Sequence, residues 1–183
     1  MPERLYYTGD EEADRLIARD PFALLVGFAL DQQVRVQQAF SGPRKLEERL
    51  GRLDAADIAG MEPDRLVAAF RAKPAVHRFP GTMAARVQEL ARVVAGEYGG
   101  RAERVWTQAR DADDLRRRIA SLPGFGEMKV IALGSVLAKR FGVEVARPLV
   151  PPFDTLADVD SPEALARYQA AKRASKAGLR AAR

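Results

Sequence analysis

The feature that most constrains the fold is a turn sequence, Leu122-Pro123-Gly124-Phe125-Gly126, set between two helical patterns. The first pattern covers residues 113–120 and the second begins near Lys129. Pro123 ends the first helix, because a proline ring disfavours the α conformation of the residue before it. The two glycines permit a turn that is too tight for residues with a Cβ. The sequence therefore predicts two helices joined at a sharp corner.

This corner would present backbone N–H groups at the start of the second helix. The first four N–H donors of a helix have no partner inside it, and the helix dipole makes this end positive, which suits a phosphate oxygen. The sequence resembles the hairpin of the helix-hairpin-helix DNA-binding motif. That resemblance implies that Leu122, Pro123, Gly124, Phe125 and Gly126, with Lys129, hold a DNA backbone. An ordinary corner between two helices is the structural alternative.

The remaining segments also have helical patterns, and none alternates apolar and polar residues as a strand does. One helix is expected from Phe22 to about Phe40, apolar on all sides through Leu30 and broken at Ser41-Gly42-Pro43. A mid-helix glycine, Gly134, predicts a close helix–helix approach. The expected fold class is all-α, with two helical lobes around a cleft.

The chain is expected to form a single unit over residues 1–183. Residues 143–160 are expected to form an extended connector, and residues 161–183 a basic helix that ends near Lys176 and a tail. The basic residues of this C-terminal segment either attract phosphates or form a solvated helix face.

Composition narrows the classes of function. The chain has 183 residues, a net charge of +5, no cysteine and a single histidine, His77. Disulfides, thiolate metal sites and iron–sulfur clusters are therefore excluded, and neither a metal site nor a cofactor is expected. No apolar run is long enough to span a membrane. A cytoplasmic, nucleoid-associated protein is expected, and the basic charge permits a nucleic-acid partner. Protein partners are not predicted.

A second stretch strengthens the DNA interpretation. The apolar residues 22–30 end in Asp31-Gln32-Gln33, about ninety residues before the turn sequence. This combination resembles the helix-hairpin-helix superfamily of DNA glycosylases, and residues 79–86 lie where that family has a turn before a helix with a Lys or Arg. The resemblance covers roughly residues 20–142. It implies that Gln32 or Gln33 enters the gap left by an extruded base; a solvent-exposed helix end is the alternative.

The resemblance also implies where the chemistry would lie. The family uses a carboxylate to stabilise the sugar cation formed when the glycosidic bond breaks. At the distance along the chain where the family usually places this carboxylate, counted from its lysine position, this sequence has Ala146, which has no carboxylate. Asp154 is therefore the predicted catalytic acid, with Glu144 and Asp31 as alternatives.

The strand-cleaving members of the family carry a lysine two residues after the second hairpin glycine. Met128 occupies that position, so we predict a monofunctional glycosylase with Met128 lining the base pocket. The alternatives are a helix-hairpin-helix protein that binds DNA without catalysis, and a helical protein-interaction domain.

Overall fold

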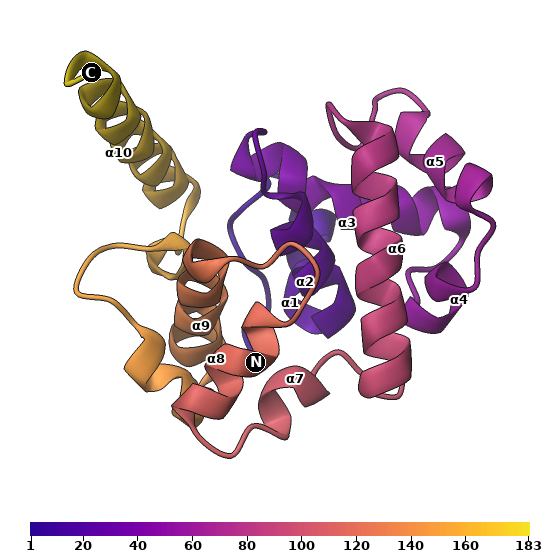
Figure 1. The fold of residues 1–183 in the computed structure, drawn as a ribbon. Helices are drawn as coiled ribbons and strands as arrows, with labels where there is room; N and C mark the ends of the chain where they lie inside the picture. Colours follow the sequence, from indigo (N-terminus) through magenta and orange to yellow (C-terminus); the bar gives the residue numbers. More distant parts are fainter.

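The computed structural model describes residues 1–183 and is helical, without β-strands. The predicted all-α class is confirmed (Figure 1). The elements in chain order are α1 (Glu11–Arg19), α2 (Pro21–Leu30), α3 (Val36–Leu50), α4 (Ala55–Ala59), α5 (Pro63–Arg71), α6 (Pro80–Glu97), α7 (Arg104–Thr107), α8 (Ala112–Ala120), α9 (Glu127–Phe141), the 3₁₀ helices η1 (Glu144–Leu149) and η2 (Leu156–Asp158), and α10 (Pro162–Ala181).

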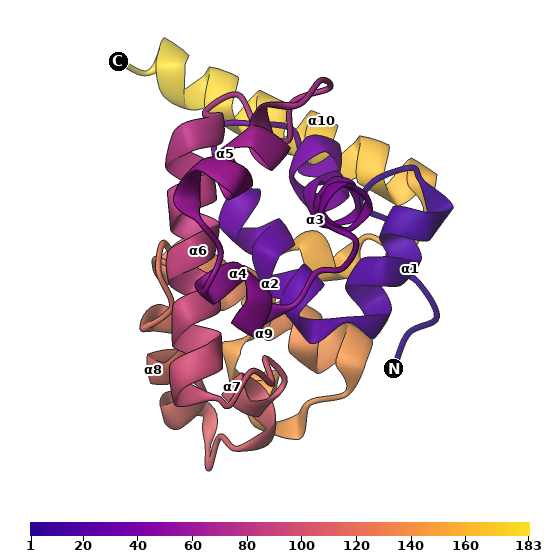
Figure 2. The same cartoon turned by 90° about the vertical axis from the view of Figure 1, so that its right-hand side faces the viewer.

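The helices pack in two groups. In the first group, α6 lies against α2, α4 and α5, while α1 and α3 pack on α2 and on each other. In the second group, α9 packs against α8, η1 and η2 (Figures 1 and 2). One continuous hydrophobic core of 49 residues, from Leu5 to Leu165, draws on both groups. The two groups therefore share a core.

Helix α2 is the most deeply buried element. Asp20 begins it by accepting hydrogen bonds from the backbone N–H groups of Phe22 and Ala23, at 2.9 and 3.2 Å. Every residue from Phe22 to Leu30 is buried, as expected for a helix that is apolar on all sides. Although α2 is so apolar, neither it nor any other helix is long enough and apolar enough to cross a membrane.

The expected single helix from Phe22 to Phe40 is wrong, because the chain breaks earlier. Helix α2 ends at Leu30, and α3 begins at Val36. The side chain of His77, which is fully buried, makes the break possible: its Nε2 lies 3.1 Å from the carbonyl oxygen of Leu30 and 3.0 Å from that of Gln32. These carbonyls therefore gain a partner outside the helix.

The predicted break at Ser41-Gly42-Pro43 is also wrong, since all three residues lie within α3. A proline inside a helix removes one hydrogen bond. Close packing against α2 compensates for that loss. A Cβ at Gly42 would lie 2.4 Å from the Leu30 side chain, and one at Gly27 would lie 2.4 Å from the Phe40 ring. The two glycines allow α2 and α3 to approach closely, which favours keeping α3 intact.

The expected extended connector at residues 143–160 is instead partly helical, because it contains η1 and η2. Leu149 of η1 packs on Gly134, where a Cβ would lie 2.8 Å from the leucine Cδ1. The close approach predicted at Gly134 is therefore confirmed, with a 3₁₀ helix as the partner. The predicted end of the last helix near Lys176 is wrong as well. Helix α10 continues to Ala181, because its outer half is rich in the good helix formers Ala, Lys and Arg.

Candidate nucleic-acid interface

The turn between α8 and α9, Ser121–Gly126, is a tight β-turn. The backbone N–H of Phe125 donates to the carbonyl of Leu122 at 3.1 Å, and Gly124 has a φ of +81°. A proline followed by a residue of positive φ is the pattern of a type II turn, which favours glycine at the second central position. Local sequence therefore determines this corner.

The residues of the α8–α9 turn alternate between anchoring and exposure. Leu122 and Phe125 are buried, at 2% and 4% exposure, whereas Gly124 and Gly126 are exposed. The apolar side chains fix the turn in the core. The backbone at the two glycines faces solvent, with no side chain to cover it. Any contact with a ligand would therefore come from the glycine backbone, which Leu122 and Phe125 support from below.

Helix α9 begins directly from this exposed backbone. Gly126 is its N-cap residue and supplies no side-chain cap. The N–H groups of Glu127 and Met128, in the first turn, have no acceptor within the helix. The Glu127 carboxylate, which lies in the same turn, pairs with Arg116 of α8. The helix start thus keeps free donors, while its nearest negative charge is paired.

Arg86 of α6 covers the other side of the turn. A Cβ at Gly124 would lie 2.1 Å from the Arg86 Nη1 atom. The guanidinium therefore lies directly against the glycine backbone. Because Arg86 is only partly buried, it adds a positive charge beside the exposed amides. Gly124 is thus required twice, for its φ and for the approach of Arg86.

Lys129 joins the turn to the end of α2. Its ammonium donates to the carbonyl oxygen of Ala29 at 3.3 Å and lies 5.6 Å from the centre of the Phe125 ring. The C-terminal end of a helix carries a partial negative charge, which favours a cation there. Burial lowers the pKa of the Lys129 ammonium, with a contribution from Arg86, while Asp31 opposes the shift.

Asp31 lies at this junction between α2 and α9. It is the C-cap residue of α2 and is partly buried. Burial raises the pKa of the Asp31 carboxyl, and the charges of Lys172 and Lys129 act in the opposite direction. Burial raises the pKa of the Tyr168 hydroxyl in α10, and the Asp31 charge raises it further. A partly desolvated carboxylate near two ammonium groups is the type of acid that can stabilise a developing cation.

Gln32 and Gln33 follow Asp31 and are exposed. Gln33 has a φ of +57°, which is uncommon for a residue with a side chain. His77 holds this loop from beneath through the carbonyl of Gln32. The backbone N–H of Phe79 donates to the other ring nitrogen of His77 at 3.0 Å, so Nε2 carries the proton. His77 is therefore a buried support for the glutamine loop.

Two of the predicted residues meet in a different place, a groove between α9, the segment Phe153–Val159 and α10. The groove has a volume of ≈ 770 Å³, and Met128 and Asp154 both line it. Met128 is 74% exposed, and its neighbour across the groove, Phe153, is 58% exposed. A cavity of this size with mostly apolar walls is typical of small-molecule and base-sized ligands. Asp154 itself is exposed at the rim.

The third predicted acid, Glu144, lies apart from the other candidates. It is exposed on η1 and pairs with Arg147 at 2.8 Å. It lines neither the groove nor the junction of α2 with α9.

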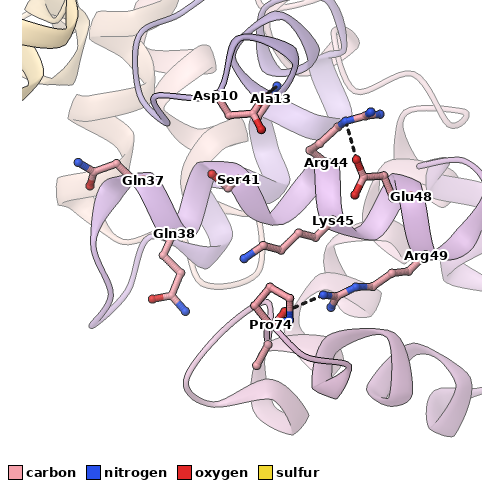
Figure 3. Close-up of a pocket in the computed structure, with 11 residues that line it drawn as sticks. Asp10, Ala13, Gln37, Gln38, Ser41, Arg44, Lys45, Glu48, Arg49 and Pro74 are labelled. Carbon is pink, nitrogen blue, oxygen red and sulfur yellow. Dashed lines mark hydrogen bonds and ion pairs between the residues drawn. The ribbon is translucent and has the colours of Figure 1, made fainter.

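A second large pocket lies between α1, α3 and the loop around Pro74, and none of the predicted site residues lines it (Figure 3). Most of its charged groups already have partners within the protein. Arg44 pairs with Glu48 at 3.1 Å, and Arg49 donates to the carbonyl of Pro74. No group of three His, Asp or Glu side chains in the chain is arranged to hold a metal ion.

The structure thus separates the candidates into two neighbouring clusters. Asp31 and Lys129 lie near each other beside the α8–α9 turn, with Gln32 next to Asp31 in the chain, and Met128 and Asp154 share the groove. Sequence reasoning did not predict that Arg86 lies against Gly124, or that Tyr168 and Lys172 lie near Asp31. The arginine at the end of residues 79–86 was the one available signal, since its position in α6 matched a basic residue of the resembled family.

Comparisons with known proteins give only a distant likeness, among solved structures. No protein-family model and no curated protein matches the chain. Among solved structures, that of a thermostable thymine-DNA glycosylase is similar at 19% identity with a TM-score of 0.48. The alignment covers 84% of this chain and 76% of the glycosylase chain. At this distance, the function has to be inferred from this chain's own residues.

Proposed function

We propose that the protein binds double-stranded DNA and hydrolyses the N-glycosidic bond of a damaged or mismatched base. One contact carries the proposal, the hydrogen bond from the Lys129 ammonium to the Ala29 carbonyl. This contact brings the α8–α9 turn beside the loop of Gln32 and Gln33. The two stretches that the sequence singled out for DNA, about ninety residues apart, therefore lie at one junction.

The backbone of one DNA strand would lie across the α8–α9 turn. The exposed backbone at Gly124 and Gly126 and the free N–H groups at the start of α9 are suited to phosphate oxygens. Arg86 adds a guanidinium beside Gly124. Leu122 and Phe125, which are buried, would hold the turn in place, and the partly exposed Pro123 would lie against the strand.

Gln32 and Gln33 would enter the duplex next to that strand. A base inside a duplex must leave the stack before its glycosidic bond can be attacked, at a cost of a few kcal/mol. An amide side chain can fill the gap and bond the unpaired partner base, because it has both donors and an acceptor. The exposure of Gln32 and Gln33, on a loop held by His77, supports this role.

The base itself would enter the groove beside Met128. In the reaction, the bond between the sugar C1′ and the base nitrogen breaks. Its electron pair leaves with the base, which takes up a proton, and a water oxygen bonds to C1′. The positive charge that forms on the sugar needs a carboxylate nearby.

We propose Asp154 for this role, because it shares the groove with Met128. Asp31 is the second candidate, since it is partly buried beside Lys129. The reaction is proposed to be monofunctional, because Met128 cannot form a Schiff base.

Release of free base from duplexes that carry a panel of damaged and mismatched bases tests this proposal. We expect Asp154→Asn to lower the rate of release by at least about 100-fold, the range found when a stabilising group for transition-state charge is removed. Asp31→Asn tests the second candidate in the same assay. Glu144→Gln is the matched control, because Glu144 is exposed and lies away from both clusters. Full activity of Asp154→Asn together with a loss in Asp31→Asn would move the role to Asp31.

A DNA-binding protein without catalysis is the second candidate function. The exposure of Asp154 favours it, since a solvated carboxylate stabilises a cation less than a partly buried one does. Tight binding of duplexes without base release from any member of the panel would select this function. Absence of salt-dependent DNA binding would contradict both functions.

A further inference from the structure

Helix α10 is held only at its base. Its N-cap Ser161 accepts a hydrogen bond from the backbone N–H of Ala164 at 3.1 Å, and Ala164 and Leu165 are buried. Every residue from 170 to 183 is exposed. In Figure 1 the outer half of the helix projects from the body of the protein. This half therefore has no structural role in the core.

The charge of this outer half has one sign. Residues 170–183 contain five Lys or Arg and no Asp or Glu. Arg173, Lys176 and Arg180 follow at intervals of three and four residues, which places them on one face of the helix. We call these three residues the α10 basic stripe. The ion pairs of the protein all involve other basic residues. The three residues of the stripe are therefore unpaired.

The base of α10 is attached next to the junction proposed to bind DNA. The Gln37 amide of α3 donates to the Gln169 side chain of α10 at 3.0 Å. Lys172 lies one turn before Lys176, the middle residue of the stripe. Its charge opposes the rise that burial causes in the pKa of the Asp31 carboxyl. The middle of helix α10, at residues 169–172, therefore lies near the glutamine loop, and the stripe continues outward from there.

We propose that the α10 basic stripe binds the phosphate backbone of the same duplex, beyond the α8–α9 turn. This inference rests on the proposed DNA binding and extends its contact surface. The stripe spans about 10 Å at 1.5 Å per residue, a length that matches about three phosphates along one strand. A second copy of the chain does not fit this surface, because its own stripe would repel the first. An acidic protein would carry the same charge as DNA, so the continuity of the stripe with the junction is what favours DNA.

The experiment measures binding of an undamaged duplex of 20 base pairs by fluorescence anisotropy at several salt concentrations. The test variant is Arg173→Gln/Lys176→Gln/Arg180→Gln. The control variant, Arg65→Gln/Arg101→Gln/Arg147→Gln, removes the same charge from exposed positions on other elements. We expect the α10 variant to bind about 10-fold more weakly at low salt and to lose about 2–3 units from the slope of log K against log salt. The control should lose much less.

Three outcomes separate this inference from the function on which it rests. An α10 variant with wild-type affinity and slope overturns the stripe, while the proposed function stands if Gly124→Val still weakens binding. Failure of the wild-type protein to bind the duplex contradicts the proposed function itself. Poly-glutamate is added as a competitor, at a total negative charge equal to that of the duplex. If it displaces the duplex from the wild type but not from the α10 variant, the stripe binds acidic proteins, and its role on DNA is overturned. Circular dichroism should show that the α10 variant remains folded, because the three substituted residues are exposed, although Lys176 also lines the groove beside Met128.

Discussion

Helices α2 and α10 both lead to residues proposed to contact DNA, but they are held in opposite ways. Helix α2 is buried from Phe22 to Leu30 and ends where His77 binds its last carbonyls. Helix α10 is buried only near its first turn and is exposed from residue 170 onward. The first helix depends on its neighbours for its length, while the second depends on its own sequence.

The difference matches what each helix would do on DNA. Filling a gap in a base stack requires a loop at a fixed position, and the packing of α2 with the support of His77 provides it. Attraction to phosphates acts over about 10 Å at ordinary salt, so it needs charge but little precision. A rigid element and a loosely attached one can therefore serve the same ligand. The following changes test whether the two helices differ in this way.

The largest effect is expected from Gly27→Val in α2. A Cβ at this position would lie 2.4 Å from the Phe40 ring, so α2 and α3 would have to separate. Overpacking of a tight core costs about 3 kcal/mol at the upper end of the usual range. We expect that loss in the free energy of unfolding, measured by urea denaturation. A variant as stable as the wild type would show that the contact between α2 and α3 is not tight.

A smaller loss is expected from His77→Ala. The change leaves the carbonyl of Gln32 and the N–H of Phe79 without their partner, while the carbonyl of Leu30 keeps the backbone N–H of Gln32 at 2.7 Å. Unpaired buried groups cost about 1–3 kcal/mol. Besides the loss in the free energy of unfolding, we expect weaker DNA binding, because the glutamine loop loses its support. Gln32→Ala separates the two effects, since an exposed side chain should affect DNA binding and leave stability unchanged.

His77 also predicts a dependence of stability on pH. Burial lowers the pKa of the His77 imidazole below its ordinary value of 6.5. The unfolded chain therefore binds the proton more readily than the folded protein does. Stability rises with pH between the lowered pKa and 6.5. We expect the contribution of His77 to be complete above pH 6.5 and to fall as the pH drops toward the lowered pKa. Denaturation of the wild type and of His77→Ala at pH 7.5 and 5.5 measures it, and the variant should lose less stability on acidification.

The smallest effect on global stability is expected from Gly178→Ala in α10. No atom lies within 4 Å of a Cβ at this position, so nothing opposes the change. Alanine favours a helix over glycine by about 1 kcal/mol. That gain should protect the amide hydrogens of the outer half of α10 from exchange, without raising the midpoint of global unfolding. A raised midpoint would mean that this half is coupled to the core, which would remove the contrast with α2.

Local sequence predicted those parts of the fold whose bonds join near neighbours. Asp20, Asp111 and Ser161 cap the starts of α2, α8 and α10 in this way. Each involves a side chain and a backbone N–H two or three residues away. The helical pattern that begins near Lys129 also forms a helix, α9, from Glu127 to Phe141.

The candidate site was less predictable than the helices around it. The sequence identified the residues of the α8–α9 turn and the glutamine pair, but not that Lys129 would connect them. The direction of the Lys129 side chain depends on the end of α2, which lies 100 residues away in the chain. The positions of Asp154 and Glu144 relative to Met128 likewise depended on the path of residues 143–160, which is partly helical.

The sequence by itself determined that this protein is a set of helices with a glycine-rich corner, because capping bonds, turn preferences and apolar periodicity act over a few residues. Only the tertiary structure decided where α2 stops, that α3 continues through Pro43 and which acids lie near which lysines. The reason is that each of these depends on a partner distant in the chain, as the carbonyls of Leu30 and Gln32 depend on His77.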